Sequence, residues 1–195
     1  MSFINTQIWK KEFAELLKLP IIMVKKNLIS GIHYENKSGQ FHKNPYIGPA
    51  RIEYHTNGQK THLIYYINDS CYRPFEEGPA YFYYYESGLI KYKEYLINDI
   101  HHRLGGPATI HYHKNGRISS EYYWVNGLRH RPTDEGPAII HYYKDGQISS
   151  EMYRVNGQLH RPIEDGPAFI EYYKNSNISH KHYWVNGKFI PEYYL

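Results

Sequence analysis

The chain repeats a short motif at a nearly constant spacing, and this constrains its fold more than any other feature. Gly-Pro-Ala begins at Gly48, Gly78, Gly106, Gly136 and Gly166, with spacings of 30, 28, 30 and 30 residues. A fixed period of this length is typical of proteins built from stacked structural repeats. A degenerate copy at residues 39–50 places the start of the array near Ile32. We therefore divide the chain into residues 1–31 and an array over residues 32–195, with about five and a half units of 28–30 residues.

Each repeat unit has two positions where turn-forming dipeptides separate apolar segments. The first position holds Asn57-Gly58, Ser87-Gly88, Asn115-Gly116, Asp145-Gly146 and Asn175-Ser176. The second position holds Asn68-Asp69, Asn98-Asp99, Asn126-Gly127, Asn156-Gly157 and Asn186-Gly187. Asn-Gly and Asp-Gly pairs favour type I′ turns, because both central residues need a positive φ. We therefore expect type I′ hairpins.

The segments between the turns alternate with a period of two, which is typical of β-strands. In the first segment Ala50, Ile52 and Tyr54 share one face, which we expect to be buried, with the opposite face exposed. In the second segment Tyr65 and Ile67 share a face that we expect to be buried. Two strands per unit predict an all-β fold: an elongated antiparallel β-hairpin repeat array that grows along one axis.

Residues 1–31 have a different pattern. Trp9, Phe13, Leu16 and Leu17 have the spacing of one face of a helix, and Pro20 is expected to end it. We expect a short N-terminal helix that caps the first open edge of the array, because stacked repeats need capped ends. The alternative is a helix that docks on a partner.

Bulk composition excludes several classes of function. The net charge is +4 with acidic and basic residues interspersed, which does not indicate nucleic-acid binding. Cys71 is the only cysteine, so no intrachain disulfide forms. The sequence has neither an apolar run of 18 residues nor a signal-peptide pattern, so we expect a protein that is not secreted and has no transmembrane segment. It also lacks the common catalytic motifs, so we expect no enzyme activity.

Polar residues recur at two positions in most of the segments that precede Gly-Pro-Ala, and we call the equivalent residues of successive units a column. His42, His102, His130 and His160 form the first column. Neighbouring units lie about 10 Å apart, too far for these histidines to share one zinc ion, so we expect loop hydrogen bonds, no metal and no cofactor. Arg73, Arg103, Arg131 and Arg161 form the second column. We expect each arginine to fix its loop through an acid of its own unit or through loop carbonyls, the alternative being a binding stripe.

The second segment of each unit has a recurring tyrosine on the face that we expect to be buried. The candidate binding residues lie mainly on the other face of this segment, where aromatic side chains and one arginine occur. They are Tyr66, Trp124, Arg154 and Trp184, together with Tyr83 and Tyr143 of the first segments. Tyr, Trp and Arg are enriched at binding hot spots. The alternative is that these residues form a second buried face.

The pattern YYx(N/D)GxI…YxVNGxxHRPxxxGPA, seen here between Tyr142 and Ala168 with Asp145 at the first turn, resembles the repeats of MORN-variant proteins. In particular it resembles the MORN-like repeat proteins of amoeba-infecting giant viruses. The resemblance covers roughly residues 32–195. It implies a ribbon of β-hairpins and a role in scaffolding or interaction, and it implies no catalytic residue.

We therefore expect a non-enzymatic repeat scaffold that mediates protein–protein interaction. The resemblance implies a virion component or a host-interaction factor of a large DNA virus, located in the virion or the host cytoplasm. We expect protein partners, with self-association through the sheet edges as a further mode. The alternative function is peripheral association with membrane phospholipid, and a third reading is an enzyme or carbohydrate binder that uses the Tyr/Trp surface.

Overall fold

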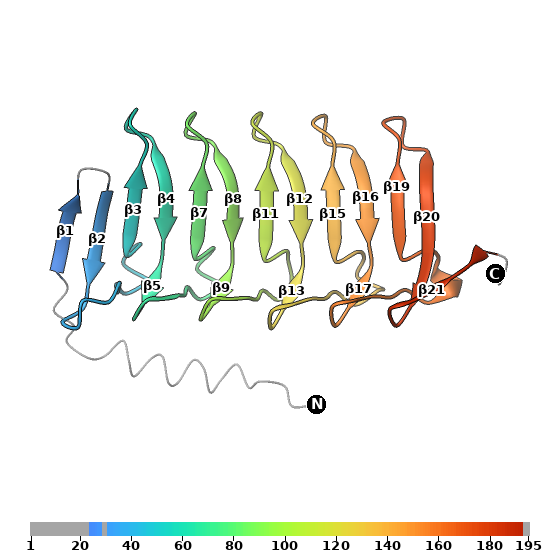
Figure 1. The fold of residues 1–195 in the computed structure, drawn as a ribbon, viewed down its shortest axis with the longest axis horizontal. Coiled ribbons are helices and arrows are strands. Elements are labelled where there is room, and N and C mark those ends of the chain that lie inside the picture. The colour runs from blue at the N-terminus through green and yellow to red at the C-terminus, as the bar shows by residue number, and fades with distance from the viewer. Residues whose placement is uncertain (1–23, 29–30, 193–195) are drawn as a thin grey trace.

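The computed structural model describes residues 24–28 and 31–192, and in these residues nearly all regular structure is β-strand. One antiparallel sheet of 13 strands runs the length of the molecule as a single-layered ribbon (Figure 1). Its strands are β1 (Val24–Leu28), β2 (Gly31–Glu35), β3 (Arg51–Tyr54), β4 (Lys60–Ile64), β7 (Tyr81–Tyr84), β8 (Ile90–Glu94), β11 (Thr109–Tyr112), β12 (Ile118–Tyr122), β15 (Ile139–Tyr142), β16 (Ile148–Met152), β19 (Phe169–Tyr172), β20 (Ile178–Val185) and β21 (Lys188–Ile190). The expected antiparallel hairpin array is confirmed, whereas the predicted helix lies outside the described residues.

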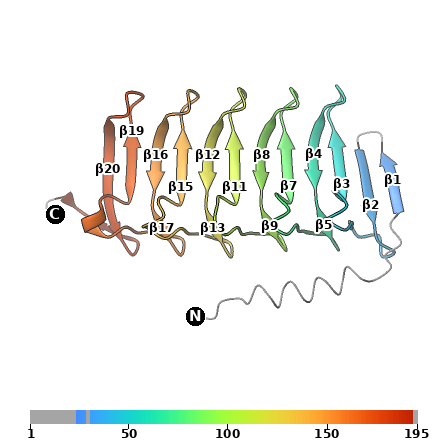
Figure 2. The same ribbon diagram turned by 180° about the vertical axis from the view of Figure 1, so that it is seen from behind.

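A second set of short strands lies along the base of the ribbon, as the front and rear views both show (Figures 1 and 2). These strands form four two-stranded hairpins: β5 (Tyr66–Ile67) with β6 (Ser70–Cys71), β9 (Leu96–Ile97) with β10 (Ile100–His101), β13 (Trp124–Val125) with β14 (Leu128–Arg129), and β17 (Arg154–Val155) with β18 (Gln158–Leu159). A complete unit therefore has four strands, and the expectation of two is wrong. The predicted second strand breaks at its tyrosine, such as Tyr65, where the chain leaves the large sheet. Only in the last unit does it continue unbroken, as β20.

The two kinds of turn differ in conformation. In the basal hairpins both central residues have positive φ, for example Asn68 at 50° and Asp69 at 66°, so the type I′ prediction is confirmed there. At the upper hairpins only the second residue has positive φ, for example Gly116 at 83°, so the type I′ prediction is wrong. The register of β11 and β12 shifts beside this turn. A left-handed glycine next to a register shift is typical of a three-residue hairpin loop with a β-bulge.

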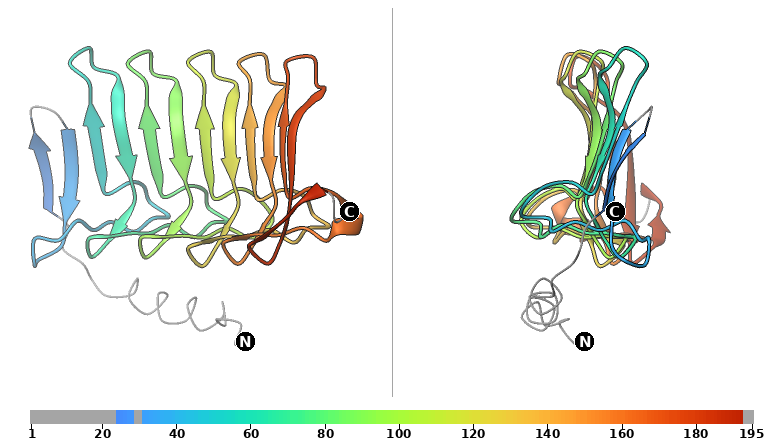
Figure 3. Two further views of the ribbon diagram at one scale, coloured as in Figure 1. Left: turned by 45° about the vertical axis from the view of Figure 1, so that its right-hand side comes forward. Right: turned by 90° about the vertical axis from the view of Figure 1, so that its left-hand side faces the viewer.

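The most buried residues lie at the base of the sheet. The alanine of each Gly-Pro-Ala has no exposed surface in any of the five units. In one cluster Ala80 packs with Ile64, Tyr65, Cys71 and Leu96. The Tyr65 backbone N–H donates to the Ala80 carbonyl oxygen at 2.8 Å. Because the base flares to both sides of the sheet, as the end-on view shows (Figure 3), the core is concentrated there rather than between two layers.

The two faces of the sheet are both partly covered. Ile110, Ile140 and Ile170 are buried on the face that we expected to be buried. The opposite face carries Ile64, Thr109 and Ile139, whose exposed fractions are 5%, 5% and 1%, so the expectation of an exposed second face is wrong. Tyr66 and Tyr81 pack against the cluster that contains Ile64.

We call this opposite face the histidine face and define it by two rows of directly paired residues, which share one side of an antiparallel sheet. The lower row is Arg51, Ile64, Tyr81, Glu94, Thr109, Tyr122, Ile139, Met152, Phe169 and His182. The upper row is Glu53, His62, Tyr83, Tyr92, His111, Ser120, His141, Ser150, Glu171 and His180.

Candidate functional site: the histidine face

Aromatic and imidazole rings contact one another in an unbroken series across the histidine face, from β4 to β15. The series consists of His62, Tyr83, Tyr92, His111, Tyr122 and His141, with centroid distances of 4.6, 5.3, 5.2, 5.6 and 5.7 Å between successive rings. Stacked and edge-on ring pairs in this distance range are favourable beyond the area that they bury. All six side chains are half-buried, so the series presents a firm surface of ring edges and faces to solvent.

The carboxylates of this face are paired with histidines. Glu53 Oε2 lies 2.7 Å from His62 Nδ1, and Glu171 Oε2 lies 3.2 Å from His180 Nδ1. Glu94 Oε1 lies 3.0 Å from Nε2 of His101, which belongs to a basal hairpin. Of the imidazoles in the ring series, His62 lies beside a carboxylate in this way, and the rings are the main chemical feature of the face.

Below the two rows, the basal hairpins present a second set of side chains, which we call the basal shelf. The shelf consists of Tyr66, Leu96, Trp124, Arg154 and Trp184 and of their cross-strand partners Cys71, His101, Arg129, Leu159 and Phe189. Ring contacts link neighbouring units: Phe41 stacks on Tyr66 at 5.4 Å and His101 stacks on Trp124 at 5.0 Å.

Four of the predicted binding residues therefore lie together on the basal shelf. All four are half-buried: Tyr66, Trp124, Arg154 and Trp184. The sequence left two alternatives, an exposed binding surface and a second buried face, and the observed burial lies between them. Tyr83 lies in the ring series of the histidine face above them.

Tyr143 lies apart from these residues, next to an upper turn. Its hydroxyl donates to the Tyr172 carbonyl oxygen of the next unit at 2.6 Å. Tyr85 makes the same contact to Tyr112 at 2.8 Å. In a third unit His113 Nε2 donates to the Tyr142 carbonyl oxygen at 3.1 Å. The hydroxyl of Tyr143 is therefore used to join two units.

The histidine column of the Gly-Pro-Ala loops also joins units. The Asn126 backbone N–H donates to His102 Nδ1 at 3.1 Å, and the Asn156 N–H donates to His130 Nδ1 at 3.0 Å. His160 Nδ1 accepts from the Asn186 N–H at 3.1 Å, whereas His42 Nδ1 lies 2.9 Å from the side-chain Oδ1 of Asn68 and 3.3 Å from its backbone nitrogen. The expected loop hydrogen bonds are thus confirmed. Within residues 31–192, no group of three or more His, Cys, Asp or Glu side chains is arranged to hold a metal ion.

The arginine column fixes the loops through carbonyl oxygens. Arg131 Nη1 donates to the Pro137 carbonyl oxygen at 3.2 Å, and its guanidinium carbon lies 4.0 Å from the centroid of the Tyr123 ring. Its backbone N–H donates to the Arg154 carbonyl oxygen of the next unit at 3.1 Å. The arrangement recurs at Arg73, Arg103 and Arg161. Of the sequence alternatives, the structure shows the loop-carbonyl one.

Cys71 is a buried member of the shelf and packs into the core cluster of Ile64 and Ala80. Burial raises the pKa of its thiol to about 12, with Asp99 and Glu94 adding to the rise. A thiol in this state is protonated at neutral pH and a poor nucleophile.

Sequence reasoning missed most of the ring series. His62, Tyr92, His111, Tyr122 and His141 were not among the predicted site residues. Along each strand, side chains alternate between the two faces of the sheet. This period of two could have placed these five residues on one face. Their contacts, however, depend on the register between strands of different hairpins.

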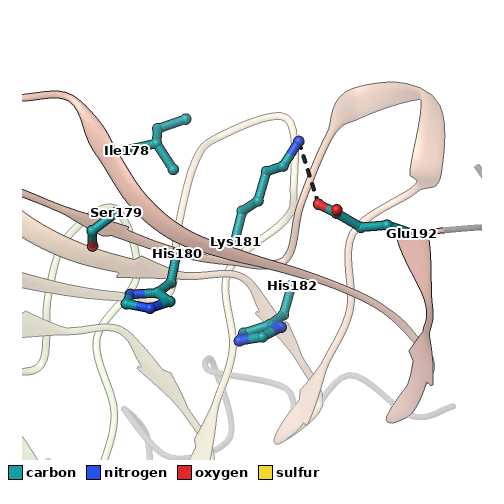
Figure 4. A pocket seen from close by; sticks show the side chains of 6 residues that line it. All are labelled: Ile178, Ser179, His180, Lys181, His182 and Glu192. Carbon is teal, nitrogen blue, oxygen red and sulfur yellow. Dashed lines mark ion pairs between the residues drawn. The ribbon is translucent and has the colours of Figure 1, made fainter.

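A shallow hollow lies at the far edge of the sheet, on the last long strand (Figure 4). It has a volume of about 630 Å³ and is lined by Ile178, Ser179, His180, Lys181, His182 and Glu192. Lys181 Nζ lies 3.4 Å from Glu192 Oε1. Its lining comes almost entirely from one strand, β20, so the hollow is an open edge rather than an enclosed site.

Comparison with known proteins gives no relative: no family model, curated protein or solved structure matches the chain. A search of the described residues for a helix long and apolar enough to span a membrane finds none.

Proposed function

We propose that this protein is a non-enzymatic repeat scaffold that binds protein partners through the histidine face and the basal shelf. The observation that carries the proposal is the unbroken series of half-buried rings from His62 to His141, with Trp124 and Trp184 on the shelf below. Tyr, Trp and Arg side chains with a buried base and an accessible surface are the usual hot spots of protein interfaces.

The contacts between units support this proposal because they order the surface before a partner arrives. Each complete unit is joined to the next by the backbone of a loop arginine, as at Arg131, and the units that carry His102, His130 and His160 are also joined by the loop histidine. A preorganised surface loses less conformational entropy on binding than a mobile one. A flat ribbon with regularly spaced rings suits an extended partner that contacts several units.

Binding is favoured over catalysis by the chemistry of the polar groups. The nearby cysteine thiol is buried and protonated, and Glu53, Glu94 and Glu171 are paired with histidines. The side chains that remain accessible on the face are mainly tyrosine and histidine rings, which supply contact area for a partner.

The proposal can be tested by selecting binders from a random peptide library on the immobilised protein. We expect the selected peptides to lose about tenfold or more in affinity on Tyr83→Ala and Trp184→Ala, because each change removes a ring from the proposed interface. Affinity would be measured by fluorescence anisotropy, and circular dichroism would confirm that the variants fold.

Tyr54→Ala is the matched control, since this tyrosine lies on the other face of β3 and is also half-buried. Peptides that bind the Tyr54 variant as tightly as the wild type would locate the interface on the histidine face. Peptides that depend on Tyr54 but not on Tyr83 or Trp184 would contradict the proposal.

A further inference from the structure

Two arginines occupy a place on the basal shelf where neighbouring units have ring stacks. In two of the earlier units, the second residue after the basal turn contacts the first residue of the next basal hairpin: Phe41 contacts Tyr66, and His101 contacts Trp124. The equivalent residues one unit further on are Arg129 and Arg154. The repeat therefore brings two positive charges together at this point.

The described part of the chain places no counter-ion beside this pair of like charges. Among the described residues, neither guanidinium has a carboxylate within ion-pair distance. The nearest candidates on the histidine face, Glu94 and Glu171, are paired with histidines. Glu121 and Glu151 lie on the other face and accept hydrogen bonds from Tyr142 and Tyr172, each at 2.7 Å. Burial, followed by the charge of Arg129, lowers the pKa of Arg154.

Three N–H donors at this point lack an acceptor. Trp124 Nε1, Arg129 Nε and Arg154 Nε are buried and have no hydrogen-bond partner in the structure. Arg154 Nη1 is already used, since it donates to the Gly157 carbonyl oxygen at 2.7 Å. Buried donors without partners are costly, and the Nη groups of a guanidinium, which reach beyond the buried Nε, donate to carboxylates. The Nε atoms of Arg73, Arg131 and Arg161 share this state, so what distinguishes this point is two neighbouring guanidiniums, for which an anion is the fitting ligand.

The walls around the pair are apolar and aromatic. The guanidinium carbon of Arg129 lies 5.1 Å from the ring centroids of both Tyr122 and Trp124. Ile139, the cross-strand neighbour of Tyr122, is almost fully buried. A setting of low polarity strengthens the attraction between a guanidinium and an anion that replaces its water.

We propose that Arg129 and Arg154 together bind a carboxylate side chain in an extended acidic segment of a protein partner. This inference rests on the proposed function and names the chemistry of the partner. A peptide is favoured over a polyanion because Glu94 and Glu171 lie on the same face on either side of the pair. Those carboxylates repel a continuous phosphate backbone but leave room for carboxylates that alternate with uncharged or aromatic residues.

The test uses the full chain and two fluorescein-labelled nonapeptides, one alternating glutamate with tyrosine and the other alternating glutamine with tyrosine. We expect the wild-type protein to bind the glutamate peptide about tenfold more tightly than the glutamine peptide, measured by anisotropy at physiological salt. The Arg129→Gln/Arg154→Gln variant should lose this preference. Arg129→Lys/Arg154→Lys keeps both charges but removes the forks, so it should lose most of the preference.

Lys114→Gln/Lys144→Gln is the control, because it removes the same two charges from exposed upper turns. It should keep the preference for glutamate. The proposal would be overturned if Lys114→Gln/Lys144→Gln lost the preference for glutamate as fully as Arg129→Gln/Arg154→Gln does. It would also be overturned if the wild-type protein showed no such preference. So would competition by inorganic phosphate as effective as that by the unlabelled peptide, which would assign a site for small oxyanions.

The outcome is separable from that of the proposed function. Suppose that library peptides lose affinity on Tyr83→Ala and Trp184→Ala but bind Arg129→Gln/Arg154→Gln as tightly as the wild type. That result would overturn this inference and leave the proposed function standing.

Discussion

Ser176 has a left-handed backbone conformation, with φ of 64°, at the upper turn of the last unit. The equivalent residues of the other units are Gly58, Gly88, Gly116 and Gly146, which all have positive φ. A residue with a Cβ atom pays a steric penalty in this region that glycine does not. The sequence therefore carries a local strain at the one upper turn whose dipeptide departs from the pattern.

We predict that Ser176→Gly increases the free energy of unfolding by about 1 kcal/mol, because it removes this penalty. The reverse change, Gly116→Ser, should decrease it by a similar amount. Gly116 is a suitable control because a Cβ atom added there would have no neighbour within 4 Å, so the change tests backbone conformation alone. Urea titration followed by circular dichroism measures both, and an unchanged midpoint for both variants would contradict the prediction.

At the scale of the structural element, the contact between a loop and the next basal hairpin depends on a neutral histidine. His102 Nδ1 can accept the Asn126 N–H only when this nitrogen carries no proton. Burial lowers the pKa of His102, although the hydrogen bond to Asn126 acts in the opposite direction. Burial also lowers the pKa of His111 and His141 on the histidine face.

These shifts predict that the protein loses stability in mild acid. A histidine whose pKa is lowered by folding binds protons more readily in the unfolded chain, whose pKa is near 6.5. The stability that depends on the neutral ring is therefore complete above pH 6.5 and is lost as the pH falls through the lowered folded-state pKa. We expect a lower thermal unfolding midpoint at pH 5 than at pH 7.5.

A His102→Asn/His111→Asn/His141→Asn variant provides the control, because asparagine does not titrate and its side-chain oxygen can still accept a hydrogen bond. Its unfolding midpoint should change less between pH 7.5 and pH 5 than that of the wild type. An equal change in the two proteins would show that other groups govern the pH dependence.

At the scale of the whole molecule, the protein is a row of units that contact mainly their neighbours. The backbone N–H of Arg73, Arg103, Arg131 and Arg161 donates to a carbonyl of the following unit in every case. The final unit differs, since β20 continues past the break that the other units show and pairs with β21. Stability in such a row is approximately the sum of the stabilities of the units and of the contacts between them.

This organisation predicts that an additional unit stabilises the protein. Inserting a second copy of residues 106–135 after Glu135 should raise the thermal unfolding midpoint by a few degrees, because it adds one unit and one more interface. Differential scanning calorimetry would measure the change.

The comparison is the same insertion with alanine at the inserted positions that correspond to His130 and Arg131. This version lacks the loop contacts, so its gain should be smaller. An insertion that lowers the midpoint, or two insertions with identical effects, would argue against nearest-neighbour stabilisation.

Much of the fold is local and could be predicted from the sequence. The period of Gly-Pro-Ala predicts the repeat, alternation predicts the strands, and Asn-Asp and Asn-Gly pairs at the basal hairpins predict turns with two positive φ values, as at Asn68 and Asp69. Each of these properties depends on the conformational preferences of a few consecutive residues. The shelf residues Tyr66, Trp124, Arg154 and Trp184 could also be singled out, because they vary within an otherwise regular column.

The tertiary structure decided which of these residues meet. The break at Tyr65 and its equivalents turns the second strand out of the large sheet, and this puts the varying column at the base of the histidine face rather than on a free surface. The ring series and the Arg129–Arg154 pair join residues of different hairpins, so they depend on strand register and on the path of the loops between units. Alternation along one strand contains no information on either, because it reports only on which side of that strand a residue lies.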